Sequence, residues 1–178
     1  MKTIDVLDKT FVPFLNAAKI EERIAALAAT INYDYKDKNP LFVAILNGSF
    51  MFAADVYKHI TVDSQITFIK LASYKGTTST GNVITAIGLE ENLKDRHIIV
   101  VEDIVDTGKT LHSFLPQLFE RGAASVEILT LLTKPEALQY EMNIKYIGFE
   151  IENKFVVGYG LDYDGYGRNI PEIYQLKS

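Results

Sequence analysis

The chain has 178 residues, of which 48% are hydrophobic and 23% are charged, a composition typical of a globular protein and not of a disordered one. Its formal net charge is −5 at pH 7, so the chain as a whole has no electrostatic attraction for nucleic acid or for an anionic membrane. It contains no cysteine, which excludes disulfides, a thiolate nucleophile and a cysteine-built zinc site.

The amino terminus carries charged residues such as Lys2 and Asp5, and no apolar segment of the kind found in export signals follows them. The longest apolar runs, such as Leu41–Leu46, are far shorter than the roughly 18 residues of a membrane-spanning helix. We therefore expect a cytoplasmic protein that binds neither a membrane nor nucleic acid.

Short apolar runs and helical patterns alternate along the chain. The apolar runs are continuous and rich in β-branched residues, which is typical of strands buried on both faces of a sheet. In chain order we predict a helix over Ala17–Ile31, a strand over Leu41–Leu46, a helix over Phe50–Ile60, strands over Ile66–Leu71, Val83–Ile87 and His97–Val101, a helix over Lys109–Arg121, and strands over Val126–Leu132, Tyr146–Ile151 and Phe155–Tyr159.

This alternation favours an α/β fold with a mainly parallel twisted sheet flanked by helices. The chain shows no repeat, low-complexity tract or linker, so we expect one domain over residues 1–178 with a core over roughly residues 35–150. Pro116 conflicts mildly with the third helix, because proline removes a backbone hydrogen bond.

One segment, Ala72–Asn82, is rich in serine, threonine and glycine and has no hydrophobic periodicity. Such a composition is typical of a loop. Two interpretations are open, namely a long hairpin connection between two strands and a lid over a functional site.

The segment His97–Thr110 carries the chemistry. Its apolar strand is predicted to end at the acidic pair Glu102 and Asp103, and a turn over Asp106–Thr110 then enters a helix. In parallel sheets ligands bind beyond the carboxyl ends of strands, and a helix amino terminus offers free N–H groups and the positive end of its dipole to a phosphate. Carboxylates beside a phosphate can accept hydrogen bonds from sugar hydroxyls or act with a divalent cation. The alternative is an acidic strand end followed by a capped helix.

Two other nucleotide-binding motifs resemble parts of the sequence, but the sequence lacks a glycine that each of them requires. A P-loop would need glycine where Asp103 stands, although Gly108 and Lys109 resemble its end. A dinucleotide fingerprint starting at Gly158 would need its third glycine where Tyr163 stands.

The stretch Val100–Leu111 closely resembles the phosphoribosyl-pyrophosphate (PRPP) motif of type I phosphoribosyltransferases, and specifically of the hypoxanthine(-guanine) phosphoribosyltransferases. The resemblance extends over roughly Leu41–Ile170. It includes a pyrophosphate loop at Leu46–Ser49, the head of a flexible catalytic lid at Ser73 and Tyr74, purine-binding segments at Leu132–Lys134 and Lys154–Tyr163, and Arg168.

The resemblance implies transfer of a phosphoribosyl group from PRPP to hypoxanthine and guanine, giving IMP and GMP plus pyrophosphate through an oxocarbenium-like transition state. It also implies a small hood built from the N-terminal segment and residues 151–178, and a homo-dimer or homo-tetramer. Rival functions are a PRPP- or nucleotide-sensing regulator on the same fold, a transferase that prefers xanthine, and a plain interaction module, which would leave the strand-end carboxylates unexplained.

By the same resemblance, Asp106 is the candidate general acid/base and the lid residues Ser73 and Tyr74 exclude water from the reacting centre. Mg²⁺ is the implied cofactor, with Asp162, Glu102 and Asp103 on the metal side. The implied PRPP-binding residues are Glu102, Asp103, Asp106, Thr107, Gly108, Lys109, Thr110, Gly48, Asn47 and Arg168.

Purine selection is assigned to three residues. Lys134 can only donate hydrogen bonds, so it can satisfy the 6-oxo group of hypoxanthine or guanine but cannot accept from the amino group of adenine. Phe155 would supply a flat apolar face for the base, and Val156 would offer backbone groups to its edge. Each has an ordinary alternative, with Lys134 as a surface residue and Phe155 as a core residue.

The pyrophosphate loop departs from the family pattern at one position, because Asn47 stands where the family commonly has lysine. A positive charge beside the leaving group is therefore missing. The family is known for a non-proline cis peptide in this loop, and backbone N–H groups would then do most of the binding.

Overall fold

A computed structural model of the protein describes residues 3–75 and 82–177. Its larger sheet has six strands in the order β5-β4-β3-β6-β7-β8. All neighbouring pairs are parallel except β4 and β5, so the predicted mainly parallel α/β fold is confirmed. The strands are β3 (Leu41–Leu46), β4 (Gln65–Lys75), β5 (Asn82–Ile87), β6 (His97–Val105), β7 (Ser125–Thr133) and β8 (Tyr146–Glu150).

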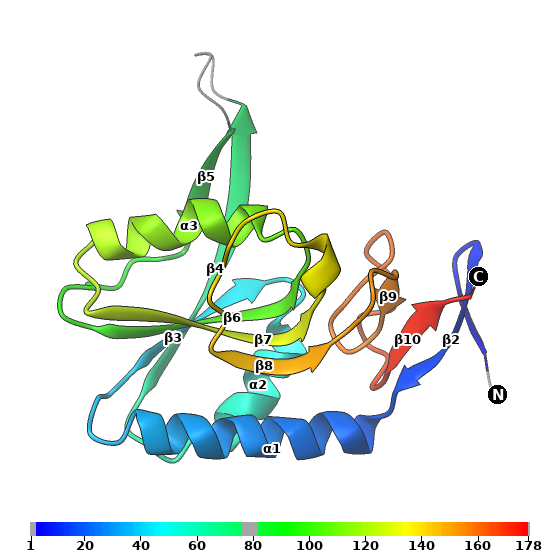
Figure 1. The fold of residues 1–178 in the computed structure, drawn as a ribbon, viewed down its shortest axis with the longest axis horizontal. Coiled ribbons are helices and arrows are strands. Elements are labelled where there is room, and N and C mark those ends of the chain that lie inside the picture. Colours follow the sequence, from blue (N-terminus) through cyan, green and yellow to red (C-terminus); the bar gives the residue numbers. More distant parts are fainter. Residues whose placement is uncertain (1–2, 76–81, 178) are drawn as a thin grey trace.

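Helices cover both faces of this sheet (Figure 1). On one face, α1 (Ala17–Asp34) and α2 (Phe50–Lys58) form a buried cluster with Phe42 and Ala44 of β3. On the other face, α3 (Lys109–Glu120) forms a second cluster with residues such as Leu41 and Val43. Because successive strand residues point to opposite faces, a strand buried between two helical layers must be apolar throughout.

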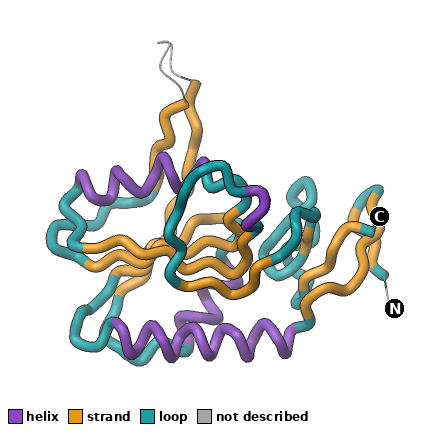
Figure 2. The backbone as a smooth tube through the Cα atoms, viewed as in Figure 1, coloured by secondary structure: helices purple, strands orange, loops and turns teal. Residues whose placement is uncertain are grey.

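A second, antiparallel sheet is formed by the two ends of the chain, in the order β1-β2-β10-β9. Figure 2 shows its strands as a group apart from the six-stranded sheet. Phe11, Val157 and Tyr174 form its small apolar core. The hood implied by the family resemblance is therefore present. Its strands are β1 (Ile4–Val6), β2 (Lys9–Leu15), β9 (Val156–Val157) and β10 (Ile173–Leu176).

The strands around the predicted loop are longer than their composition indicates. β4 continues to Lys75 and β5 begins at Asn82, with Ser73 paired to Ile84 in an antiparallel ladder. The prediction that the loop begins at residue 72 was therefore wrong, because backbone pairing between the two strands outweighs the weak strand propensity of residues such as Ala72 and Asn82. The rest of the predicted lid, residues 76–81, lies outside the described residues.

Among the other elements, whose bounds shift by at most four residues, two differences bear on the site. β6 passes through the acidic pair and ends at Val105, because its ladder with β7 continues to the pair Val105 and Thr133. The strand predicted over Phe155–Tyr159 is reduced to two residues, because the chain turns at Gly158, whose φ of +100° lies in the left-handed region. Pro116 is accommodated within α3.

A short 3₁₀ helix, η1 (Pro135–Ala137), follows β7. Within the part of the chain that the structure describes, no helix is both long enough and apolar enough to span a membrane.

Candidate active site

The carboxyl ends of β3, β6 and β7 lie next to one another, because β6 pairs in parallel with both of its neighbours. Each of these strands is followed by a segment that the sequence singled out. β3 leads to Asn47 and Gly48, β6 leads to Asp106–Thr110, and β7 leads to Lys134. The fold therefore gathers residues that are far apart in the sequence at one edge of the sheet.

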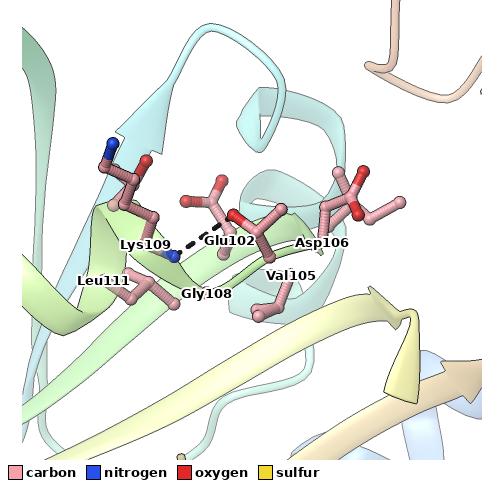
Figure 3. A pocket seen from close by; sticks show the side chains of 9 residues that line it. Glu102, Val105, Asp106, Gly108, Lys109 and Leu111 are labelled. Atoms are coloured by element: carbon pink, nitrogen blue, oxygen red, sulfur yellow. Dashed lines mark hydrogen bonds between the residues drawn. The ribbon is translucent and has the colours of Figure 1, made fainter. Parts of the chain in front are cut away.

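The turn after β6 forms a small pocket of about 170 Å³. Gly108 has a φ of +77° and precedes the first residue of α3, and the Lys109 amide lies 3.4 Å from the Thr107 hydroxyl oxygen (Figure 3). The first N–H groups of a helix have no partner within it, so this turn is suited to an anion. The pocket is lined by Glu102, Ile104, Val105, Asp106, Thr107, Gly108, Lys109, Thr110 and Leu111.

A second pocket of about 210 Å³ adjoins the first and shares Ile104 and Asp106 with it. Phe155 is 43% exposed, so it presents its ring to this pocket and is not a core residue. Lys134 is 7% exposed, so it is not an ordinary surface lysine. The pocket is lined by Asp103, Ile104, Asp106, Lys134, Phe155, Val156, Leu161 and Asp162.

Lys134 and Asp106 form an ion pair in the lining of the second pocket. The Lys134 ammonium donates to Asp106 Oδ2 at 3.0 Å, and the Lys134 backbone N–H donates to the Val105 carbonyl at 3.0 Å. The lysine side chain is 8% exposed and the aspartate side chain 49%, so the buried charge is balanced by a carboxylate that substrate can reach. The predicted purine donor and the predicted acid/base are thus in direct contact.

The acidic pair brings two carboxyl groups close together at the end of β6. Burial, followed by the neighbouring Asp103 carboxylate, raises the pKa of Glu102 well above its ordinary value of 4.5. The Asp103 N–H donates to Glu102 Oε1 at 3.2 Å, and Asp103 Oδ1 accepts from the Ile104 N–H at 2.8 Å. Within residues 3–75 and 82–177 neither carboxylate has an ion-pair partner. The two carboxyl groups can therefore bind a cation or accept hydrogen bonds from hydroxyl groups.

The raised pKa predicts that Glu102→Gln stabilises the protein. The folded chain holds the Glu102 proton more tightly than the unfolded chain, so wild-type stability falls as pH rises from 4.5 through the raised pKa. Glutamine removes that loss, so we expect the Tm of the variant at pH 8 to be higher than that of the wild type. Thermal unfolding with chelator from pH 4 to pH 8 measures it.

The exposed Glu136 supplies the control, since Glu136→Gln should leave Tm nearly unchanged at every pH. A gain for Glu102→Gln that is the same at pH 4 and pH 8 would contradict this account of the charge.

The loop after β3 packs directly against the acidic pair and the hood. The peptide bond between Leu46 and Asn47 is cis, as the resemblance implied. A side-chain carbon at Gly48 would lie 1.7 Å from Asp103 Oδ2, and one at Gly160 would lie 2.1 Å from the Gly48 carbonyl oxygen. Glycine is therefore required at Gly160, where the contact is with backbone, and any side chain at Gly48 would displace the Asp103 carboxylate, so the loop, the acidic pair and the turn after β9 are closely packed.

Asp162 and Arg168 lie close together in the hood, on the segment that joins β9 to β10. Arg168 donates to Asp162 Oδ1 at 2.9 Å and to the Gly160 carbonyl at 2.7 Å. The other carboxylate oxygen of Asp162 accepts from the Gly165 N–H at 2.6 Å. Asp162 lines the second pocket, whereas Arg168 lines neither pocket.

Ser73 and Tyr74 lie on β4, beyond the edge of the sheet that carries the site. Lys70 of β4 pairs with Leu46, the last residue of β3, so Ser73 and Tyr74 come after the end of β3. Their proposed catalytic role remains a prediction.

Sequence reasoning missed four apolar residues that line the pockets, namely Ile104, Val105, Leu111 and Leu161. Ile104 lies between Asp103 and Asp106 and contributes to both pockets, and Leu161 precedes Asp162. Their only signal was an apolar residue next to a polar one, which is common in strands and turns.

Comparison with known proteins identifies the family. The phosphoribosyl transferase domain matches residues 14–164. A hypoxanthine-guanine phosphoribosyltransferase of Streptococcus pneumoniae strain R6 is 44% identical over 160 residues, covering 89% of each chain. A hypoxanthine-guanine-xanthine phosphoribosyltransferase of Tritrichomonas foetus is 40% identical over 163 residues, covering 91% of this chain and 89% of the relative. The chain belongs to the phosphoribosyl transferase family, in the group of the hypoxanthine-guanine phosphoribosyltransferases.

A solved structure agrees with this assignment. The crystal structure of a hypoxanthine phosphoribosyltransferase from Staphylococcus aureus superposes with a TM-score of 0.87 at 37% identity, covering 93% of this chain and 91% of that chain. The resemblance seen in the motifs is therefore confirmed at the level of family and fold.

Proposed function

We propose that this protein is a purine salvage enzyme that transfers the phosphoribosyl group of PRPP to hypoxanthine and guanine, releasing pyrophosphate. One observation carries the proposal: a pocket at a helix amino terminus adjoins a pocket with an aromatic face and a buried lysine, and Asp106 lines both. A sugar 5′-phosphate fits the first pocket and a flat oxo-bearing base fits the second, with the ribose between them.

The reaction joins a purine ring nitrogen to C1′ of the ribose as the bond from C1′ to the pyrophosphate oxygen breaks. The purine gives up its proton, and we assign Asp106 as the carboxylate that accepts it. The enzyme's main tasks are then to hold the reactants in line and to stabilise the departing pyrophosphate. Asn47, Gly48 and Arg168 are the residues we assign to the pyrophosphate. Because Asn47 carries no charge, backbone N–H groups must contribute more there than in relatives with lysine.

Mg²⁺ fits the donor set of this site when it arrives with PRPP. Among residues 3–75 and 82–177 no three acidic or histidine side chains are close enough to hold a metal on their own. Mg²⁺ commonly uses one or two carboxylates together with substrate phosphates and water, and the uncompensated carboxylates of Glu102 and Asp103 can serve in that way. Asp162, already bonded to Arg168 and to the Gly165 N–H, would act through water. The bound cation would offset the negative charge of the leaving pyrophosphate.

A steady-state assay tests the function. The purified chain receives PRPP and Mg²⁺ with hypoxanthine, guanine, xanthine or adenine, with and without chelator. We expect nucleotide from hypoxanthine and guanine, none from adenine, and loss of activity with chelator. Binding of PRPP without nucleotide formation would instead identify a sensor, and faster use of xanthine would favour the activity named for the Tritrichomonas foetus relative. We also propose a cytoplasmic homo-dimer or homo-tetramer, which rests on the family resemblance and which sedimentation can check.

The buried lysine gives the sharpest specificity prediction. Lys134→Met keeps the length of the side chain but removes the donor for the 6-oxo group, so we expect kcat/KM for hypoxanthine to fall about 10- to 100-fold while the KM for PRPP changes little. Kinetics with each substrate varied in turn measure the two effects.

Lys145 provides a matched control, because it also pairs with an aspartate, Asp34, at 3.1 Å, but lies in neither pocket. Lys145→Met should leave both constants near wild type. An equal rise in the KM values for both substrates in Lys134→Met would remove the assignment of Lys134 to the purine oxygen.

A further inference from the structure

The segment Leu138–Met142, which we call the bracing segment, runs between η1 and β8 and lies against the turn of the first pocket. The Gln139 N–H donates to the Thr107 carbonyl at 3.0 Å. This bond ties the backbone of the bracing segment to the backbone of the turn. The connection is local in space but not in sequence, because 32 positions separate the two residues (139 − 107).

Side chains of the bracing segment also enclose Gly108. A side-chain carbon at Gly108 would lie 3.3 Å from Met142 Cε, 3.4 Å from Leu138 Cδ2 and 4.0 Å from Tyr140 Cβ. These three residues therefore occupy the side of Gly108 on which any other amino acid would carry its side chain. The bracing segment therefore packs against the turn at Gly108, whose φ of +77° lies in the left-handed region.

A stacked ring pair fixes the bracing segment to α3. The rings of Tyr140 and His112 lie with their centroids 4.4 Å apart and their planes at 24°. His112 belongs to the first turn of α3, and its N–H donates to the Gly108 carbonyl at 2.9 Å. His112 thus connects Tyr140 to the backbone of Gly108 at the first pocket.

No residue of the bracing segment lines either pocket of the candidate site. We infer that the bracing segment, pinned by the stack of Tyr140 on His112, is a positioning element that holds the Asp106–Thr110 turn in its phosphate-binding shape. The inference rests on the proposed function, which assigns this turn to the 5′-phosphate. A turn that is already ordered loses little freedom when the phosphate binds, whereas a loosened turn must be ordered by the ligand and binds it more weakly.

The test compares IMP with inosine, which differ only in the 5′-phosphate, by titration against the purified chain. The ratio of the inosine Kd to the IMP Kd isolates the phosphate contribution. In Tyr140→Ala we expect this ratio to fall about two- to tenfold, the range for an aromatic stack, with the inosine Kd unchanged. Tyr140→Phe keeps the ring and should retain the wild-type ratio. His112→Ala removes the exposed partner of the stack and should reproduce the loss if Tyr140→Ala folds poorly.

Tyr33, which is 85% exposed on α1, supplies the control, and Tyr33→Ala should not change the ratio. An unchanged ratio in both Tyr140→Ala and His112→Ala, or an equal weakening of IMP and inosine, overturns the inference while leaving the proposed function in place. A wild-type chain that makes no nucleotide from PRPP and hypoxanthine removes the proposed function instead. A wild-type chain that binds IMP no better than inosine removes the inference.

Discussion

Replacing Asp106 by asparagine is expected to lower kcat by about 10²- to 10⁴-fold, the usual contribution of a positioned general acid/base. The substitution keeps the shape of the side chain, and an asparagine oxygen can still accept the hydrogen bond that Lys134 now donates at 3.0 Å. What is lost is the capacity to take a proton from the purine. Single-turnover measurements of nucleotide formation separate this chemical step from product release.

The fold should survive this substitution, because the Asp106 side chain is 49% exposed and makes its ion pair at the rim of the site. We expect Tm to change by no more than about 2–4 °C, equivalent to about 1 kcal/mol. A kcat near that of the wild type, with Tm also unchanged, would show that the purine proton leaves by another route.

Gly160→Ala should damage both stability and catalysis. The new methyl group would lie 2.1 Å from the Gly48 carbonyl oxygen, at a residue whose φ is +96°. Overpacking and the left-handed backbone together should cost about 2–4 kcal/mol, or roughly 4–16 °C in Tm. Because the carbonyl belongs to the pyrophosphate loop, we also expect kcat/KM for PRPP to fall about 100-fold, the effect of a displacement near 1 Å.

Gly165→Ala separates the effect of the clash with the Gly48 carbonyl from the effect of the left-handed backbone. Gly165 also has a left-handed φ of +84°, but a side-chain carbon there would meet nothing within 4 Å. Its substitution should therefore show only the backbone cost of about 1–2 kcal/mol, with near-normal kinetics. Equal losses of activity in the two variants would mean that contact with the pyrophosphate loop is not the cause.

The phosphate turn could be predicted from the sequence because all of its determinants are consecutive. A strand, an acidic pair and a Gly/Thr turn before a helix occupy one stretch, His97–Thr110, and the structure places Glu102 and the turn in the first pocket and Asp103 in the adjoining one. Even here the strand end was misplaced, since β6 continues past Asp103 to Val105. The apolar pattern stops where side chains become polar, but the backbone ladder with β7 does not.

The contact between Lys134 and Asp106 could not be predicted from residue patterns. The two residues are 28 positions apart, and their meeting depends on the register of β6 with β7, in which Val105 pairs with Thr133. Lys134 was found only because its segment resembles a known family. Of the hood strands only β9 was predicted, within the longer strand expected over Phe155–Tyr159, and β1, β2 and β10 were missed for a related reason. They are short and partly exposed, and β2 pairs with β10 from the opposite end of the chain.

The pairing of β9 with β10 determines the order in which the two halves of the site are completed during protein synthesis. Val156 pairs with Gln175, and the Leu176 N–H donates to the Phe155 carbonyl at 2.9 Å. Phe155 and Val156, which line the second pocket, are therefore held in place by β10. The turn over Asp106–Thr110, in contrast, contacts β6, α3 and the bracing segment, all of which precede residue 143 in the chain. As the chain leaves the ribosome, the segments that we assign to the phosphate are therefore synthesised before the strand that supports the wall of the second pocket.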